Sequence, residues 1–195
     1  MSENTAALSA KRRMTTKTLV YCAMLAALQI VLARVVSIVP TRDMRISIEA
    51  VPTVLAGILF GPLAGAMVGF SADLVGCLTL NPFPYNPIFA LPPVLYGLFG
   101  GLLRYYINAK PNFFRVLLTY VPPVVLGSIF WQSAAIAYIN NSQGAFLASL
   151  KVLLYSRSLQ FLIAGPLEAL ITFFLLKSGI FQALKVWPLS KKTKV

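Results

Sequence analysis

Basic side chains alternate with apolar runs along this chain, and this alternation constrains the fold more than any other feature. Twelve of the seventeen Lys and Arg residues fall into three clusters, separated by runs long enough to cross a bilayer. The clusters are Lys11, Arg12, Arg13 and Lys17; Arg104, Lys110 and Arg115; and Lys177, Lys185, Lys191, Lys192 and Lys194. Because cytoplasmic loops retain Lys and Arg, we expect all three clusters on the cytoplasmic side of a membrane.

The composition narrows the class of protein further. Hydrophobic residues make up 58% of the chain and charged residues 11%, against about 25% charged residues in a soluble domain. A net charge of +12 would suggest nucleic acid in a soluble protein. Here the topology and the anionic inner leaflet explain that charge, so we expect a lipid bilayer and no nucleic acid as its partner.

The chemistry available to an enzyme or a metal site is sparse. The chain has no His, and its two Cys residues, Cys22 and Cys77, both lie inside apolar runs. The commonest general base and the commonest metal ligand are therefore missing. We predict no catalytic residue, no metal and no cofactor. No phosphate-binding loop of the G-x-x-x-x-G-K-[ST] kind is present in the sequence, so any energy must come from an ion gradient or another chain.

Six apolar segments predict an all-α integral membrane protein with six transmembrane helices. The segments span residues 19–36, 46–60, 63–80, 88–105, 114–139 and 158–176, with a loop before the second and an amphipathic stretch at 145–156 before the last. Six crossings that start in the cytoplasm also end there, so both termini are predicted to be cytoplasmic. The second segment is short, at roughly 15 residues against the usual ~20, and it could be tilted, interfacial or enclosed by its neighbours.

These segments predict one membrane domain over residues 1–195, in a multi-pass protein of the plasma membrane. Its parts are a flexible cytoplasmic N-terminus (1–14), a six-helix bundle (19–177) and a basic cytoplasmic tail (178–195).

Small residues recur at every fourth position in two places. The first stripe is Gly57, Gly61, Gly65 and Gly69, and the second is the pair Ala23 and Ala27 in the first helix. Such spacing lets helix backbones approach closely in lipid. For each stripe the sequence leaves two interpretations open, packing inside the bundle or a smooth face for a partner helix.

Three carboxylates, Glu49, Asp73 and Glu168, lie in or near the predicted membrane segments. An ionisable group in this environment is costly unless it is paired or functional. Their spacing does not suggest general acid–base chemistry. The sequence leaves open whether they pin helices together or relay protons.

Five basic residues lie outside the three clusters, toward the outer side: Arg34, Arg42, Arg45, Lys151 and Arg157. Arg42 and Lys151 could snorkel to lipid headgroups. Arg34 and Arg157 lie within apolar sequence, where a guanidinium suits the recognition of a carboxylate.

Polar and aromatic side chains accompany these cations. Gln160 follows Arg157 by three residues on the same helix face. The aromatic residues on this side are Phe83, Tyr85, Phe89, Trp131 and Tyr138. They could form an interfacial belt. Together with the arginines and the amide, they instead describe a pocket for a flat, polar, anionic molecule.

Several strings resemble the substrate-binding S components of energy-coupling factor (ECF) transporters, most closely the folate-specific branch. These are Arg34-Val-Val-Ser-Ile38, Arg45-Ile-Ser-Ile48, Leu59-Phe-Gly-Pro62, Gly65-Ala-Met-Val-Gly69 and Asp73-Leu-Val-Gly76. The loop Pro84-Tyr-Asn-Pro-Ile-Phe-Ala-Leu91 keeps both prolines, Tyr85, Phe89 and Leu91 of the folate pattern and departs from it at Asn86, Ile88 and Ala90.

The resemblance implies a six-helix protein of bacterial membranes that captures a vitamin, here folate, from outside. Such a protein docks on a transmembrane coupling subunit driven by two ATPase subunits, and Ala23 and Ala27 match the docking face. The expected substrate-binding residues are Arg34, Arg45, Pro84, Tyr85, Asn86, Phe89, Trp131, Lys151, Arg157 and Gln160. Pantothenate, thiamine or riboflavin in the same scaffold, a membrane-embedded lipid enzyme, and an assembly subunit without a ligand are the alternatives.

Overall fold

The structure of the chain is a computed structural model that describes residues 16–36, 38–41, 44–80, 85–109, 112–139 and 146–183. Side chains are described over the same ranges except 38–46, 80, 109 and 182–183. The helices are α2 (Thr16–Arg34), α3 (Ala50–Phe60), α4 (Pro62–Leu80), α5 (Leu91–Leu102), α6 (Arg104–Ala109), α7 (Phe113–Pro123), α8 (Gln132–Ile139), α9 (Phe146–Lys177) and α10 (Ile180–Ala183). A 3-10 turn, η1 (Pro87–Ala90), precedes α5, and a π-helical segment, η2 (Val124–Trp131), joins α7 to α8.

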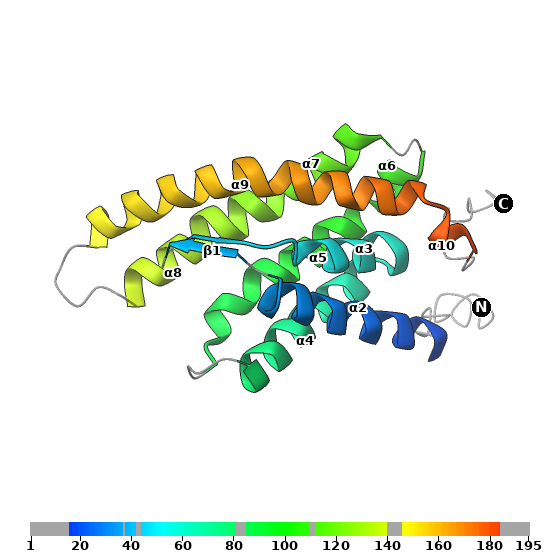
Figure 1. Cartoon of the computed structure of the whole chain (residues 1–195), viewed down its shortest axis with the longest axis horizontal. Helices are drawn as coiled ribbons and strands as arrows, with labels where there is room; N and C mark the ends of the chain where they lie inside the picture. The colour runs from blue at the N-terminus through cyan, green and yellow to red at the C-terminus, as the bar shows by residue number, and fades with distance from the viewer. Residues whose placement is uncertain are drawn as a thin grey trace, which may run out of the picture.

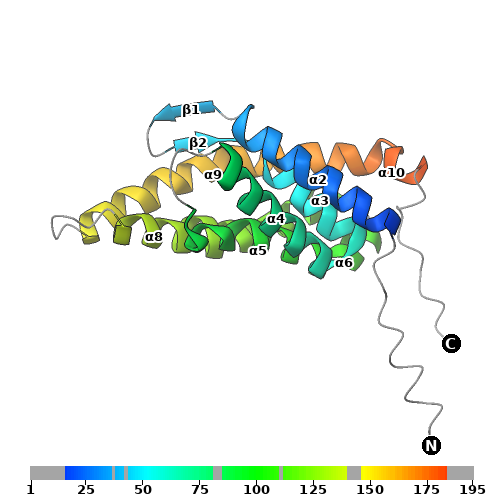
Figure 2. The same cartoon turned by 90° about the horizontal axis from the view of Figure 1, so that it is seen from below.

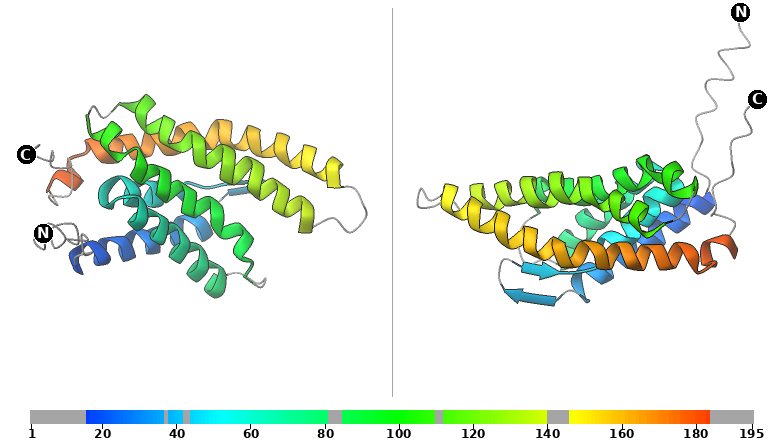
Figure 3. Two further views of the ribbon diagram at one scale, coloured as in Figure 1. Left: turned by 180° about the vertical axis from the view of Figure 1, so that it is seen from behind. Right: turned by 90° about the horizontal axis from the view of Figure 1, so that it is seen from above.

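The helices form an elongated bundle in which α9 lies along the α7–η2–α8 rod (Figure 1). The first residues of α2 and the last residues of α9 lie at the same end of the bundle, and α8 and the start of α9 lie at the opposite end (Figure 3). Thus Arg34, at the C-terminal end of α2, is far from the end at which α2 begins.

Four helical stretches of the described chain are long and apolar enough to cross a bilayer: Thr16–Arg34, Pro62–Thr79, Phe113–Ile139 and Phe146–Lys177. The remaining two predicted segments form the shorter apolar helices Ala50–Phe60 and Pro87–Leu102. The short second segment is enclosed by its neighbours, because every residue of α3 from Ala50 to Leu59 is buried.

The last predicted segment differs in length from the helix that contains it. The stretch at 145–156 and the last predicted segment are one helix, α9, because Arg157 at the predicted break turns into the protein and is buried. With 32 residues, α9 is about 48 Å long, more than the ~30 Å hydrocarbon core of a bilayer.

The loop predicted before the second segment contains a β-hairpin, which amends the all-α prediction. Strands β1 (Ile38–Thr41) and β2 (Met44–Ile46) pair antiparallel, with Ile38 opposite Ile46 and Thr41 opposite Met44. The hairpin lies over the bundle beside α9 (Figure 2), and β2 contacts that helix.

Glycines set the contact between α3, α4 and α5. A Cβ on Gly57 or Gly65 would collide with the backbone of Gly97, and one on Gly69 would collide with Pro93. The glycine stripe therefore serves packing inside the bundle. Gly61 ends α3 with a φ of 109°, a left-handed conformation that a residue with a side chain rarely adopts, and α4 begins one residue later.

The π-helical segment η2 follows Pro122 and Pro123 directly. Proline lacks an N–H and its ring clashes with the preceding turn, so the normal helical hydrogen-bond register cannot continue through this pair. The wider π turn places Ser128 at the inner wall of the bundle, where its side chain is buried.

Candidate substrate-binding cavity

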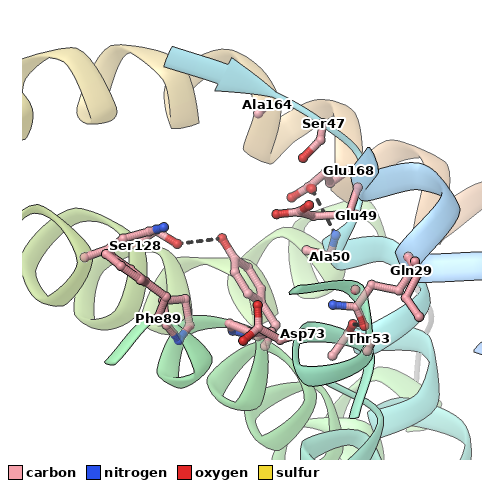
Figure 4. Close-up of a pocket in the computed structure, with 18 of the residues that line it drawn as sticks. Gln29, Ser47, Glu49, Ala50, Thr53, Asp73, Phe89, Ser128, Ala164 and Glu168 are labelled. Atoms are coloured by element: carbon pink, nitrogen blue, oxygen red, sulfur yellow. Dashed lines mark hydrogen bonds between the residues drawn. The ribbon is translucent and has the colours of Figure 1, made fainter. Parts of the chain in front are cut away.

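A cavity of about 330 Å³ lies between α2, α3, α4, α5 and α9. Figure 4 shows its lining side chains pointing inward from helices that are far apart in the sequence. Its polar lining residues are Gln29, Arg34, Ser47, Glu49, Thr53, Asp73, Cys77, Tyr96, Ser128, Gln132, Arg157, Gln160 and Glu168. A polar cavity enclosed by apolar helices is the kind of site that binds a small polar molecule.

Helix α9 supplies one wall of the cavity. Arg157, Gln160, Ala164 and Glu168 all line it, and their spacing of three, four and four residues places them on one helix face. Arg157 and Gln160 are buried, and the Arg157 Nη1 donates a 3.0 Å hydrogen bond to the Gln132 Oε1 on α8. The amide oxygen thereby holds the guanidinium in place at the wall.

The opposite wall carries a second guanidinium. The Arg34 Nη2 on α2 donates to the Cys77 Sγ on α4 at 3.2 Å, and the Cys77 thiol lies 3.8 Å from the Asp73 Oδ1 one turn earlier. Arg34, Asp73 and Cys77 all line the cavity. These contacts fix the C-terminal end of α2 against α4 and present a cation to the cavity.

Two carboxylates meet at the N-terminus of α3. The backbone N–H of Ala50 donates to the Glu168 Oε1 at 3.4 Å, and Glu49 is the residue that precedes the helix. Figure 4 shows Glu49 and Glu168 side by side at the cavity wall. The positive end of the α3 dipole favours negative charge at this position.

Hydroxyl and amide groups complete the polar lining. Thr53 on α3 donates to the Gln29 Oε1 on α2, and both side chains are buried. The Tyr96 hydroxyl pairs with the Ser128 hydroxyl at 3.3 Å. Among the described residues, no group of three His, Cys, Asp or Glu side chains could hold a metal ion.

Four of the residues predicted to bind substrate come together in this cavity. Arg34 from α2, Phe89 from η1, and Arg157 and Gln160 from α9 all line it. Their convergence could not be read from their separation in the sequence, which exceeds 100 residues between Arg34 and Arg157.

The other residues predicted to bind substrate either do not line the cavity or lie outside the residues that the structure describes. The Trp131 side chain is 46% exposed, and its Nε1 donates to the Ile88 backbone oxygen at 2.8 Å instead of lining the cavity. Lys151 is exposed near the start of α9. The Arg45 side chain and the whole of Pro84 lie outside the described residues. For these residues, substrate binding stays a prediction.

Tyr85 and Asn86 lie just before η1, at the segment that carries Phe89 into the cavity. The Asn86 Oδ1 accepts a 3.1 Å hydrogen bond from the Ile88 N–H and so caps the turn. Burial, together with the charge of Asp73, raises the pKa of Tyr85 above its usual value, so its phenol stays neutral.

Several lining residues were not assigned to the site from the sequence: Gln29, Thr53, Tyr96, Ser128 and Gln132. Gln29 and Gln132 did carry a signal, because an amide within an apolar helix needs a polar partner. The three carboxylates also line the cavity, although the sequence alone gave them no ligand role.

Ala23 and Ala27 lie on the outward face of α2, and both are exposed. The same face carries Leu19, Val20, Met24, Leu28 and Val31, all exposed. The opposite face packs on α3 and α4, where Cys22 contacts Ala56, Ala64 and Val68 in a small buried cluster. The alanine pair therefore does not pack inside the described bundle.

The fold and the cavity define a membrane-embedded protein whose helices surround a polar site for a small molecule. The chain belongs to the family of ECF transporter substrate-specific components, whose family model matches residues 17–176. This confirms the resemblance found in the sequence.

Individual relatives agree with the family. The chain is 28% identical over 155 residues to the folate transporter FolT of Clostridium novyi (strain NT), covering 80% of this chain and 85% of that protein. A crystal structure of FolT bound with folic acid is 25% identical with a TM-score of 0.68, over 83% of this chain and 93% of that one. An ECF S-component for biotin shares the fold at 18% identity, with a TM-score of 0.55 over 94% and 98% of the two chains.

Proposed function

We propose that this chain captures folate at the outer face of the membrane and delivers it to the coupling subunit of an ATP-driven importer. The observation that carries this proposal is the enclosed cavity in which two guanidinium groups, Arg34 and Arg157, face a polar interior. The similarity to FolT with folic acid bound supports folate over the other vitamins.

Each lining group has a chemical role in this proposal. Arg34 and Arg157 compensate the charge of the glutamate carboxylates, since an arginine offers them two parallel hydrogen bonds. Phe89 supplies an aromatic face, and Gln160 supplies both a donor and an acceptor for a ring edge. Tyr85 and Asn86, just before η1, and Trp131, which donates to Ile88 of η1, are proposed to contact the ligand near the entrance. Pro84 is proposed as a further contact, and Arg45 and Lys151 as further positive charge for the acidic tail.

The proposed topology has six membrane crossings with both termini in the cytoplasm. Arg34 and the start of α9 then lie toward the outside, and Lys17, Arg104, Arg115 and Lys177 lie toward the cytoplasm, as the retention of basic residues there requires. The enclosure of α3 by other helices supports counting this short helix as a crossing.

We further propose that the exposed Ala23 and Ala27 face of α2 meets the transmembrane coupling subunit, and that two ATPase subunits drive the cycle. Small residues on an exposed apolar helix face allow close approach of a partner helix within lipid. The plasma membrane is then the site of action.

Isothermal titration of the detergent-purified chain with folic acid tests the proposed ligand. We expect saturable one-site binding, and weaker or no binding of pantothenate, thiamine, riboflavin and biotin. Mass spectrometry of small molecules that co-purify with the chain provides an independent check. A folded sample that binds another vitamin in preference to folic acid would overturn the folate assignment.

A further inference from the structure

We infer that Glu168, together with Glu49, recognises the hydrogen-bond donor edge of the ligand's heterocycle, so that the ring lies deep in the cavity and its acidic tail points outward. This inference rests on the proposed function and adds to it the orientation of the ligand and a specificity-determining residue.

The charges of the cavity are arranged along its depth. Glu168 follows Arg157 by eleven residues on the same face of α9, which places it about 16 Å further along the helix. Arg34 lies at the C-terminal end of α2 and lines the same cavity as Arg157. Along α9 the cavity wall is therefore basic at Arg157 and acidic at Glu168, whereas on the α2–α4 wall Arg34 lies with Asp73 beside Cys77.

Glu168 has unused hydrogen-bonding capacity that faces this cavity. Its side chain is 3% exposed, and its Oε1 accepts the Ala50 N–H. Its Oε2 is buried and has no hydrogen-bond partner among the described residues. A buried acceptor without a partner is costly, so such an atom at the wall of a binding site points to a donor supplied by the ligand.

The polar neighbours of Glu168 do not fill this role within the described part of the chain. The Tyr96 hydroxyl is paired with Ser128, and the Tyr120 hydroxyl is paired with Thr172 at 2.6 Å. Glu49 beside it adds negative charge to the same position (Figure 4). The two carboxylates together favour a group that is rich in donors or positively charged.

A 2-amino-4-oxopyrimidine ring, such as that of a pterin, presents this kind of group. Its ring N–H and exocyclic NH₂ point the same way, so they can donate two parallel hydrogen bonds to one carboxylate. A dioxopyrimidine edge of the flavin kind has a single N–H between two acceptors and would place an oxygen against the carboxylate. The acidic end of the cavity therefore selects the 2-amino group, and the tail carboxylates lie toward Arg34 and Arg157.

The test compares two ligands on two proteins by titration: folic acid and 2-desamino-folic acid, on the wild-type chain and on Glu168→Gln. The wild-type chain should bind folic acid at least tenfold more tightly than the analogue. In Glu168→Gln that ratio should fall toward one, mainly because folic acid binds 10- to 100-fold more weakly. Thr172→Val, a buried change one turn further along α9 and outside the cavity lining, should keep the wild-type ratio.

Other outcomes separate the inference from the proposed function. Equal wild-type affinity for the two ligands, or an unchanged ratio in Glu168→Gln, would overturn the inference and leave folate binding in place. Equal affinity of the wild-type chain for the two ligands overturns the inference even if Glu168→Gln fails to fold. No binding of folic acid by the folded wild-type chain would overturn the proposed function as well.

Discussion

The Arg34 guanidinium on α2 donates a hydrogen bond to the Cys77 thiol on α4 at 3.2 Å, at the wall of the cavity. The contact joins residues that are 43 positions apart and places a nucleophilic sulfur directly beside the proposed ligand. The cysteine therefore offers a chemical probe of occupancy that needs no change to the protein.

We expect folic acid to slow the alkylation of Cys77 by N-ethylmaleimide. Cys77 is half-buried and lines the cavity, so a bound ligand must block the reagent. Cys22 is 7% exposed and packs against Ala56, Ala64 and Val68, so it should react slowly with or without ligand. Peptide mass spectrometry of timed samples measures both rates. Equal Cys77 rates with and without saturating folic acid would place the ligand elsewhere.

We predict that Arg157→Ala weakens folic acid binding by about 10- to 100-fold, which corresponds to roughly 1.5–3 kcal/mol for a lost charge-assisted hydrogen bond. Gln132→Ala should have a smaller effect, because Gln132 is uncharged and positions the Arg157 guanidinium through a 3.0 Å hydrogen bond. Titration calorimetry measures both.

Arg115→Ala is the matched control for the loss of positive charge. Arg115 lies near the start of α7, where its Nη1 donates to the Tyr106 backbone oxygen, and it does not line the cavity. Its removal should leave folic acid affinity unchanged. A similar loss of affinity in Arg115→Ala and Arg157→Ala would indicate a general effect of charge and not a contact with the ligand.

Gly97→Ala should destabilise the bundle, and Gly165→Ala should not. A Cβ on Gly97 would collide with the backbone of Gly65, and backbone cannot move aside as a flexible side chain can. Overpacking of this kind costs about 1–3 kcal/mol or more. Apart from its chain neighbours and the adjacent backbone of α9, no described atom lies within 4 Å of a Cβ built on Gly165. The better helix propensity of alanine, about 1 kcal/mol, is opposed there by the ring of Pro166, which disfavours a helical residue with a Cβ before it, so stability should change little.

Thermal unfolding of the detergent-purified variants, followed by tryptophan fluorescence, measures the difference between these two glycines. The midpoint for Gly97→Ala should fall by several degrees or the variant should fail to accumulate. A wild-type midpoint for Gly97→Ala would show that the crossing of α4 and α5 is looser than the structure describes.

The sequence predicted the class of protein and the elements that depend on hydropathy. Each predicted apolar segment corresponds to a helix or a run of helices. The hairpin was missed because its strands have four and three residues, too few for an alternating pattern to emerge. The sequence separates an amphipathic stretch at 145–156 from the last apolar segment, whereas the structure joins them in α9, where Arg157 between them pairs with Gln132 from another helix.

The site was predictable only in its unusual charges. Arg34 and Arg157 could be predicted as binding residues because each lies in apolar sequence, and the structure brings both to one cavity. Glu168 could not be assigned a role in the same way. Its backbone partner, Ala50, is 118 residues away, and such a contact leaves no trace in local spacing. The sequence also could not show that the Trp131 Nε1 donates to the Ile88 backbone oxygen, because that contact joins residues 43 positions apart.

The exposed face of α2 leads to a prediction that separates capture from transport. We expect Ala23→Leu together with Ala27→Leu to abolish folate uptake in cells that contain the coupling and ATPase subunits, and to leave binding by the purified chain unchanged. Neither alanine lines the cavity, and both are exposed, so larger side chains there disturb neither the ligand nor the packing of α2 on α3 and α4. They would hold a partner helix away from the close approach that small residues permit.

Ala148→Leu is the control for a bulky change on a helix surface. Ala148 is exposed near the start of α9, at the end of the bundle opposite to the first turns of α2 (Figure 1). This variant should take up folate at the wild-type rate, because added apolar surface by itself does not interfere with a protein that lies in lipid. Uptake of radiolabelled folate, normalised to the amount of each variant in the membrane, gives the comparison. Normal uptake by the Ala23 and Ala27 double variant would remove this face of α2 from the partner interface. Lost uptake with weakened folate binding would mean that the change acts on the cavity through α2.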